Sequence, residues 1–241
     1  MGVLQAMYRD SKLLHYFDIV RQQSTDFDLF RQDISKSFDI LDLGCGQGSL
    51  AVFLAPLVKS VDGVDLSPEM ISLANQKKSK MELANVDFVV GDMYHINPKK
   101  RYDCVVMGNS VLSDVNGIEN QVALFEKIRS CLNKSGKLLF TIVLLDNSMF
   151  EKEYLKREIT DPETNNKFSI RYENQLDLAT SCWKTEIIIN DFFNNHEHRV
   201  QYQASLYTRN EILLLLKFMG FKIVRETGSS GWMKYFSCEM I

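Results

Sequence analysis

Hydrophobic positions along the chain form short apolar runs that alternate with stretches of helical periodicity. The runs are rich in Val, Ile and Leu, as strands covered on both faces should be. They are DILDL (39–43), VDGVDL (61–66), VDFVVGD (86–92), YDCVVMG (102–108) and KLLFTIVLL (137–145). Helical spacing follows Ser67 and recurs from Ile118 to Leu132. This alternation predicts right-handed crossovers in a mostly parallel sheet with helices on both faces.

The alternation breaks between residues 147 and 206, where polar turns separate stretches with strand character. The stretches are KFSIRYENQLDL (167–178), WKTEIIINDFF (183–193) and HRVQYQASL (198–206). Apolar and polar positions alternate strictly in the last of them, which indicates a half-buried strand. We expect a small antiparallel β insert at the ligand edge of the main sheet, where it would cover the site and select an acceptor. A dimerisation sheet is an alternative that is compatible with this role.

Both ends of the chain contain further periodic segments. Thr208 and Glu211 form a capping-box signature before ILLLLKFM, and Gly220 can end that helix ahead of the strand FKIV (221–224). The stretch YFSCEMI (235–241) predicts a last strand. Near the N-terminus one helical face carries Leu13, Tyr16, Phe17 and Val20.

Composition disfavours several classes of protein. The chain has 241 residues, 45% of them hydrophobic, which suits one large domain or a domain with an insertion. A net charge of −3 and a pI near 5.9 give no basic excess for binding nucleic acid. The five scattered cysteines include no C-x-x-C pair, and the longest apolar run (138–145) is too short to span a membrane. We therefore expect a cytoplasmic protein with reduced thiols, no metal and no membrane contact.

The stretch FDILDLGCGQGSL (38–50) places three glycines directly after a predicted strand. A dinucleotide-binding loop reads G-x-G-x-x-G, whereas Gly48 follows Gly46 by only two residues and Ser49 takes the place of the third glycine. Glycine lets a ligand lie against the main chain because it has no Cβ. Asp42 adds a carboxylate at the same edge, which would repel a pyrophosphate and favour a cationic ligand.

Two further aspartates end predicted strands at this edge. Asp65 lies about 20 residues beyond the glycine loop, the position from which a carboxylate accepts both hydroxyls of a ribose. Asp92 can accept from an exocyclic amine while Met93 packs on a flat base. A ribose, an adenine-like ring and a positive group together describe S-adenosylmethionine. We expect Asp65 to face the ligand rather than the core, so that its replacement leaves folding intact; the alternative for both aspartates is a structural role in a turn.

Four motifs resemble those of the class I S-adenosylmethionine-dependent methyltransferases in their order and spacing. They are ILDLGCGQG (40–48), VDGVDLSPEM (61–70), VVGDMYHI (89–96) and LNKSGKLLF (132–140). The resemblance covers residues 38–145 and resumes at 207–224. It implies that the methionine end of the cofactor binds Asp42, Gly44, Cys45, Gly46 and Gly48, the ribose Asp65, and the base Leu66, Asp92 and Met93, with Met70 a further cofactor contact and Asn109 near the transferable methyl.

The same resemblance implies an α/β, Rossmann-like, doubly wound sheet of seven mostly parallel strands with an antiparallel last strand. We expect an N-terminal helical lid over residues 1–37, a cofactor-binding core formed by 38–146 and 207–241, and the β insert at 147–206. In related enzymes an N-terminal helix often covers the cofactor, which makes Tyr8 and Tyr16 candidates for the pocket wall. Packing is the alternative role for both tyrosines.

The residues that would assist catalysis are less well defined. A sulfonium methyl is already activated, so its transfer mainly needs an aligned lone pair and the exclusion of water. Asp114 is the carboxylate nearest in sequence to the expected methyl position, and together with Tyr16 it is a candidate catalytic residue. Cys45 is interpreted as a small buried side chain rather than a nucleophile. His196 and His198 are interpreted as surface strand residues rather than metal ligands.

The methyl acceptor is bounded by what the sequence lacks. MGNSVLSD (107–114) contains no Asn-Pro-Pro-Tyr type of motif, and no RNA-binding module is recognisable. We expect methyl transfer to a nitrogen or oxygen of a small molecule, with nucleic acid disfavoured and homodimerisation left open. The alternatives are a tRNA-modifying methyltransferase of the same fold, an NAD-linked oxidoreductase, and a module that binds S-adenosylmethionine without turnover.

Overall fold

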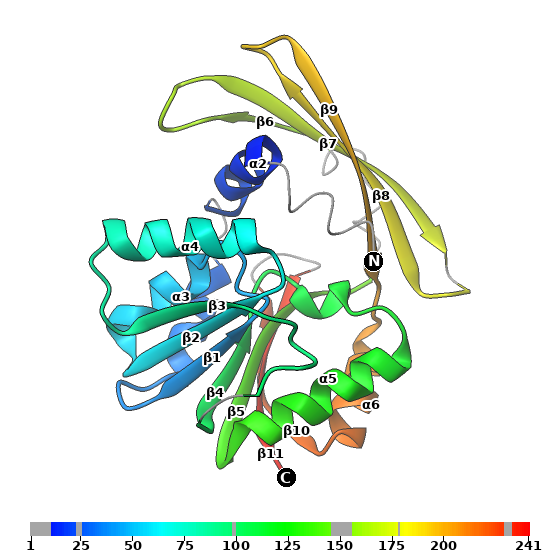
Figure 1. The fold of residues 1–241 in the computed structure, drawn as a ribbon. Helices are drawn as coiled ribbons and strands as arrows, with labels where there is room; N and C mark the ends of the chain where they lie inside the picture. Colours follow the sequence, from blue (N-terminus) through cyan, green and yellow to red (C-terminus); the bar gives the residue numbers. More distant parts are fainter. Residues whose placement is uncertain (1–10, 23–25, 98–99, 146–155, 178, 229–232) are drawn as a thin grey trace.

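The computed structural model describes residues 11–22, 26–97, 100–145, 156–177, 179–228 and 233–241. Within them, seven strands form one sheet in the order β10-β11-β5-β4-β1-β2-β3 (Figure 1). These strands are β1 (Asp39–Leu43), β2 (Ser60–Asp65), β3 (Val86–Val90), β4 (Tyr102–Met107), β5 (Leu132–Val143), β10 (Phe221–Gly228) and β11 (Met233–Met240). Neighbouring strands are parallel except β11, which is antiparallel to β5 and β10. The predicted fold class is confirmed, with the antiparallel last strand inside the sheet rather than at its edge.

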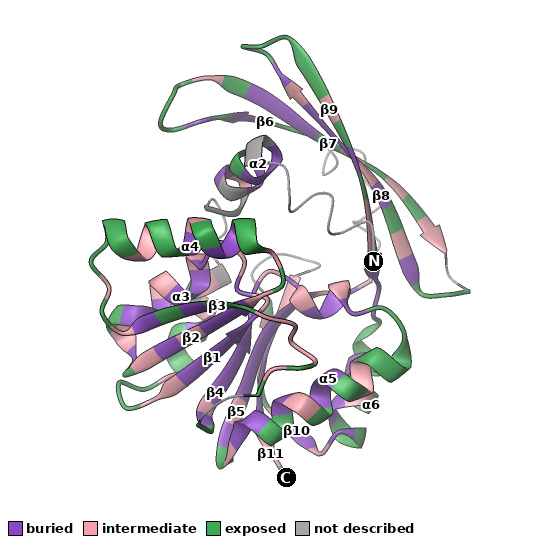
Figure 2. Cartoon of the chain, viewed as in Figure 1, coloured by how far each residue is buried: buried purple, intermediate pink, exposed green. Residues whose placement is uncertain are grey.

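Helices cover both faces of this sheet, as the alternating pattern predicts. They are η1 (Asp26–Asp33), α3 (Ser49–Leu54), η2 (Ala55–Leu57), α4 (Pro68–Lys80), η3 (Val111–Asp114), α5 (Ile118–Cys131) and α6 (Arg209–Phe218). On one face α5 and α6 share a hydrophobic core with η3, and on the other η1, α3 and α4 form a second core. Figure 2 shows the strands between these layers as mostly buried and the outer sides of α4 and α5 as exposed. No helix in the described part of the chain is both long and apolar enough to cross a membrane.

The helix ends follow capping signals that are visible in the sequence. The Ser67 side chain accepts from the backbone amide of Met70 at 3.2 Å, one turn into α4. The amide of Glu211 donates to Thr208 Oγ1 at 3.3 Å, and the Glu211 carboxylate accepts from the Thr208 amide at 2.6 Å. Gly220 follows α6 with a φ of 72°. Because these contacts satisfy amides that otherwise lack helical partners, α4 and α6 begin where the sequence predicts.

A second, antiparallel sheet holds four strands in the order β6-β7-β8-β9. Its strands are β6 (Lys156–Thr160), β7 (Lys167–Asp177), β8 (Cys182–Asp191) and β9 (His196–Ser205). The pattern of apolar and polar residues predicts β7, β8 and β9 but not β6, which pairs with the edge of β7. The predicted antiparallel insert is therefore confirmed and is one strand larger than expected.

The N-terminal helix α2 (Ser11–Gln22) lies between the second sheet and the main sheet (Figure 1). Its apolar face, with Leu13 and Phe17, joins Phe168, Ile170 and other residues of the second sheet in a third hydrophobic cluster. A link to the glycine loop comes from the Gln47 side chain, which donates to the backbone oxygen of Leu14 at 3.3 Å. The helix α2 thus contacts both the second sheet and the loop expected to bind the cofactor.

The second sheet joins the main sheet close to the carboxyl end of β4. The amide of Leu145 donates to the backbone oxygen of Tyr207 at 2.8 Å. Ser205 Oγ, at the end of β9, donates to the backbone oxygen of Val115 at 3.1 Å. Since Val115 follows η3 directly, the end of β9 is held beside the loop that follows β4.

Candidate functional site

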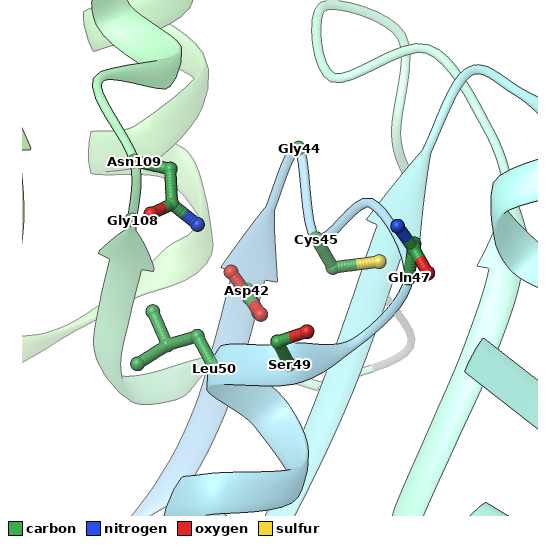
Figure 3. A pocket seen from close by; sticks show the side chains of 8 residues that line it. All are labelled: Asp42, Gly44, Cys45, Gln47, Ser49, Leu50, Gly108 and Asn109. Atoms are coloured by element: carbon green, nitrogen blue, oxygen red, sulfur yellow. The ribbon is translucent and has the colours of Figure 1, made fainter. Parts of the chain in front are cut away.

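A pocket opens at the carboxyl ends of β1 and β4, the edge where a doubly wound sheet binds ligands. Its lining residues come from the glycine loop, the start of α3 and the loop after β4: Asp42, Gly44, Cys45, Gln47, Ser49, Leu50, Gly108 and Asn109. Figure 3 shows the side chains of Asn109 and Cys45 on opposite sides of Asp42. Four of the cofactor-binding positions implied by the resemblance, Asp42, Gly44, Cys45 and Asn109, therefore lie together.

The glycine loop has a conformation that side chains with a Cβ rarely adopt. Gly44, Gly46 and Gly48 have φ values of 67°, 54° and 75°. A Cβ on Gly44 would lie 2.7 Å from Val111 Cγ1, and one on Gly48 would lie 2.4 Å from Phe88 Cζ. Both the dihedral angles and the surrounding side chains thus require glycine, which keeps the main chain accessible at the pocket.

Replacing Gly44 with alanine is expected to destabilise the protein more than the same change at Gly117. Both glycines have positive φ, 67° and 85°, but a Cβ on Gly117 would meet only Asn120 Nδ2, at 4.0 Å. Gly117→Ala should cost about 1–2 kcal/mol for the left-handed conformation alone. Gly44→Ala should add about 1–3 kcal/mol because Val111 must move. Urea denaturation measures both; equal losses would show that Val111 yields freely.

Asp42 is a buried carboxylate with an unsatisfied oxygen. It is 1% exposed, and its Oδ2 has no hydrogen-bond partner among the residues that the structure describes. Burial, and after it the negative charge of Asp65, raises the pKa of Asp42 well above its usual range, while the backbone amide of Ala51 acts in the opposite direction. A cationic amine at this oxygen would supply the missing donor and favour the ionised carboxylate. The site therefore fits the amino group at the methionine end of S-adenosylmethionine.

Asp65 makes two hydrogen bonds to the protein backbone at the end of β2. Its Oδ2 accepts from the Gly46 amide at 2.8 Å, and its Oδ1 accepts from the Ser67 amide at 2.9 Å. The carboxylate joins the glycine loop to the start of α4, so we expect its replacement to affect folding, unlike the prediction from the sequence. A carboxylate oxygen can accept more than one hydrogen bond, so binding a ribose and bracing the loop are compatible.

The other positions implied for the base lie at the rim. Asp92 is 40% exposed, accepts from the Tyr94 amide at 3.0 Å, and has His95 Nδ1 at 2.9 Å from its Oδ2. Leu66 is 54% exposed, so a flat ligand can pack against it, whereas Met70 is 1% exposed. Asp92 and Leu66 thus remain accessible to a ligand. Met70 is enclosed by protein and does not line the pocket.

Cys45 and Asn109 line the pocket in different ways. Cys45 is buried, as predicted, and burial raises the pKa of its thiol, with the charges of Asp42 and Asp65 acting in the same direction. Asn109 and the following Ser110 have positive φ values of 51° and 59°. Two consecutive left-handed residues hold the loop after β4 in a strained form, which often marks a functional site.

Sequence reasoning misses four of the lining residues: Gln47, Ser49, Leu50 and Gly108. Gln47 is 6% exposed and bonded to α2, so only the path of the N-terminal segment explains its burial. A Cβ on Gly108 would lie 3.0 Å from Leu50 Cδ2. Gly108, the last residue of YDCVVMG, was therefore a signal for a close approach between the end of β4 and α3.

The two candidate catalytic residues have different surroundings. Tyr16 does not line the pocket; its hydroxyl donates to Asp191 Oδ2 at 2.7 Å and its ring lies 4.8 Å from that of Phe168. This places Tyr16 in the contact between α2 and the second sheet, which is the packing alternative, while Tyr8 lies outside the described residues. Asp114 ends η3 and accepts from the Tyr202 hydroxyl at 2.7 Å.

Of the two histidines of β9, His198 also lies at that contact. The rings of His196 and His198 lie 4.4 Å apart, and the ring of His198 lies 5.8 Å from that of Tyr16. Within the described ranges, no group of three or more His, Cys, Asp or Glu side chains is arranged to hold a metal ion. His198 thus lies beside α2, whereas His196 is an exposed residue of the same strand.

Comparison with known proteins gives consistent matches. A family model described as a methyltransferase domain matches residues 34–218. A putative methyltransferase of Bacillus subtilis is 34% identical over 198 residues, 78% of this chain and 75% of that protein. A malonyl-(acyl-carrier protein) O-methyltransferase of Ilyobacter polytropus is 25% identical over 186 residues, 74% of this chain. The chain spans 65% of that relative and 58% of a second one from the same organism, less than two thirds of either.

Solved structures share the fold at lower sequence identity. An S-adenosylmethionine-dependent methyltransferase from Clostridium acetobutylicum has a TM-score of 0.74 at 18% identity, over 95% of this chain and 98% of that one. An amino pentose methyltransferase from Micromonospora echinaspora, solved with S-adenosylmethionine bound, has a TM-score of 0.72 at 18% identity, over 100% and 98% of the two chains. At these identities the likeness is evidence for the fold alone.

Proposed function

This chain belongs to the S-adenosylmethionine-dependent methyltransferase family, and from that premise we propose that it transfers a methyl group from S-adenosylmethionine to a nitrogen or oxygen of a small-molecule acceptor. The observation that carries the proposal is the buried, unpartnered Oδ2 of Asp42 beside a glycine loop with three left-handed residues. A buried acceptor without a partner costs about 1–3 kcal/mol. A ligand with an ammonium group at this position offsets that cost.

We assign the different parts of the cofactor to different residues around the pocket. The cofactor supplies an activated methyl group, so the protein must bind, orient and exclude water. We assign the cofactor's amino group to Asp42, its ribose to Asp65 and its base to Leu66, Asp92 and Met93. Gly46 and Gly48 keep the main chain close to the ligand, and Asn109 borders the pocket on the side of β4.

The acceptor would approach from the second sheet. The end of β9 is held beside η3 through Ser205 and Tyr202, so the inner face of this sheet adjoins the loop that carries Asn109. Asp114 is the candidate base there, and the Tyr202 hydroxyl fixes its carboxylate. We assign Tyr16 to holding α2 in place rather than to catalysis, because its hydroxyl is bound to Asp191.

The relatives favour a small acceptor without naming one for this chain. One curated relative is a malonyl-(acyl-carrier protein) O-methyltransferase, and one structural neighbour is an amino pentose methyltransferase. These names span oxygen and nitrogen acceptors, so we propose only the small-molecule class. Cytoplasmic location, homodimerisation and the residue bounds of the lid, core and insert stay predictions from the sequence.

Calorimetry with S-adenosylmethionine, S-adenosylhomocysteine and NADH tests the cofactor. We expect both adenosyl ligands to bind and NADH not to bind, because Asp42 would face a pyrophosphate with a like charge. Binding of NADH alone would favour the oxidoreductase alternative. Incubation with methyl-labelled cofactor and either a dialysable metabolite extract or total tRNA then tests transfer. Label in small molecules supports the proposal, and label in tRNA supports the alternative of a tRNA-modifying methyltransferase. Cofactor binding without any labelled product would indicate a module without turnover.

A further inference from the structure

A row of polar side chains crosses the inner face of the second sheet, next to the apolar cluster that α2 covers. Asn174 pairs with Thr185 across β7 and β8, and Thr185 pairs with Tyr202 across β8 and β9. Because paired residues on neighbouring strands point to the same face, these three side chains lie side by side. Thr185 is 2% exposed, and Asn174 is half-buried. Polar groups in such a position need hydrogen-bond partners.

The amide of Asn174 has a defined orientation. Its Oδ1 accepts from Trp183 Nε1 at 2.8 Å and from Thr185 Oγ1 at 2.7 Å. The indole nitrogen can only donate, so the atom that faces it must be the amide oxygen. The amide nitrogen Nδ2 therefore points away from Trp183, and within the described parts of the chain it is buried without a hydrogen-bond partner. A native protein rarely leaves such a donor unpaired unless a ligand or water binds it.

The row leads from Asn174 to the candidate site. Its last member, Tyr202, donates to Asp114 at 2.7 Å, and Asp114 lies in the segment that follows Asn109. With strands about 4.8 Å apart, Asn174 lies about 10 Å across the sheet from Tyr202. Tyr172 and Leu176 lie on the same face of β7 as Asn174, and Trp183 pairs with Leu176 from β8. All three are half-buried, so the donor lies among apolar and aromatic groups.

We propose that Asn174 is a specificity-determining residue that binds an oxygen of the methyl acceptor, at a point remote from the atom that is methylated. This inference rests on the proposed function. The acceptor it describes carries a hydroxyl, carbonyl or carboxylate oxygen to receive the Nδ2 hydrogen, and an apolar or ring portion that packs against Trp183 and Tyr172. Thr185 and Trp183 are positioning residues, because their bonds hold the amide oxygen and so direct the nitrogen to the ligand.

The test compares Asn174→Asp with Gln175→Glu. The aspartate can still accept from Trp183 and Thr185, but it presents a negative oxygen where the amide donated. Gln175 is the next residue, exposed on the opposite face, so its variant makes the same chemical change away from the proposed subsite. The probe is methyl-labelled S-adenosylmethionine with the dialysable small-molecule fraction of a cell extract. Labelled products are identified by mass, and the KM of the main acceptor is then measured.

We expect Asn174→Asp to raise the acceptor KM by about tenfold or more, with kcat and the Kd for S-adenosylhomocysteine changed less than about twofold, and Gln175→Glu to behave as wild type. Thr185→Val keeps the shape but removes one of the two bonds that hold the amide oxygen. It should raise KM less, and it serves as the test if the aspartate variant folds poorly. An unchanged KM in both variants, or a labelled acceptor with no oxygen besides the methylated group, overturns the inference while leaving the proposed function intact. If the wild type labels nothing, the proposed function fails first.

Discussion

Asp42→Asn is expected to stabilise the protein without ligand and to weaken the binding of S-adenosylmethionine about 10- to 100-fold. The carboxylate is 1% exposed, and one of its oxygens has no partner in the described part of the chain, so its charge opposes folding until a cation binds. Asparagine keeps the shape and removes the charge. The same change therefore removes a cost of the free protein and the main attraction for the cofactor's ammonium group.

The stability gained by Asp42→Asn should depend on pH. Burial raises the pKa of Asp42 in the folded protein above the unfolded value. Between those two values the folded protein binds more protons, so its stability falls as the pH rises. We expect the stability gained by Asp42→Asn to be small below the unfolded pKa, to grow as the pH rises, and to level off above the folded pKa. Because the ammonium group favours ionised Asp42, wild-type cofactor affinity should rise over the same range.

Thermal unfolding over a pH series, with calorimetry at each pH, measures both effects. Asp87→Asn is the control, since Asp87 is 77% exposed and forms a surface ion pair with Lys78. A lowered melting temperature in Asp42→Asn with unchanged cofactor affinity would contradict the assignment. It would mean that the carboxylate serves the fold and that another group binds the amine.

The elements that local chemistry determines were predictable from the sequence. The strands β1 to β5 fall in short runs rich in Val, Ile and Leu, and Ser67 and Thr208 cap helices where their spacing indicates. The glycines after β1 also carry their own signal, because three left-handed positions in one loop can hardly be filled by other residues. From local signals of this kind, the fold class and four of the eight residues that line the pocket could be predicted.

Features that depend on distant contacts were not predictable. The strand β6 reads KREIT, with three charged residues in a row, because it is an edge strand that buries little besides Ile159. The role of Gln47 depends on where α2 packs, 33 residues away in sequence. The orphan amide of Asn174 becomes visible only after Trp183 and Thr185 are placed beside it.

Asp65→Ala is expected to lower both the stability of the protein and its affinity for the cofactor. The substitution removes the acceptor for the Gly46 and Ser67 amides, and each charge-assisted bond contributes about 1.5–3 kcal/mol. The glycine loop would lose its tie to α4, so folding should suffer as well. In Asp65→Asn the side chain keeps one oxygen but presents a donor to the other amide, so we expect intermediate losses.

A measurement specific to the ribose separates the two roles of Asp65. Calorimetry compares S-adenosylhomocysteine with its 2′-deoxyribose analogue on wild type, Asp65→Ala and Asp62→Ala. Asp62 is on the same strand, but it accepts from the Tyr102 hydroxyl at 2.8 Å and pairs with Lys100, so its loss should affect stability without affecting either ligand. Wild type and Asp62→Ala should bind the deoxy analogue at least about tenfold more weakly than S-adenosylhomocysteine, because a hydroxyl bonded to a carboxylate is lost. In Asp65→Ala the two ligands should bind alike. If the preference for the hydroxyl persists there, Asp65 only braces the loop, and the ribose contacts another residue.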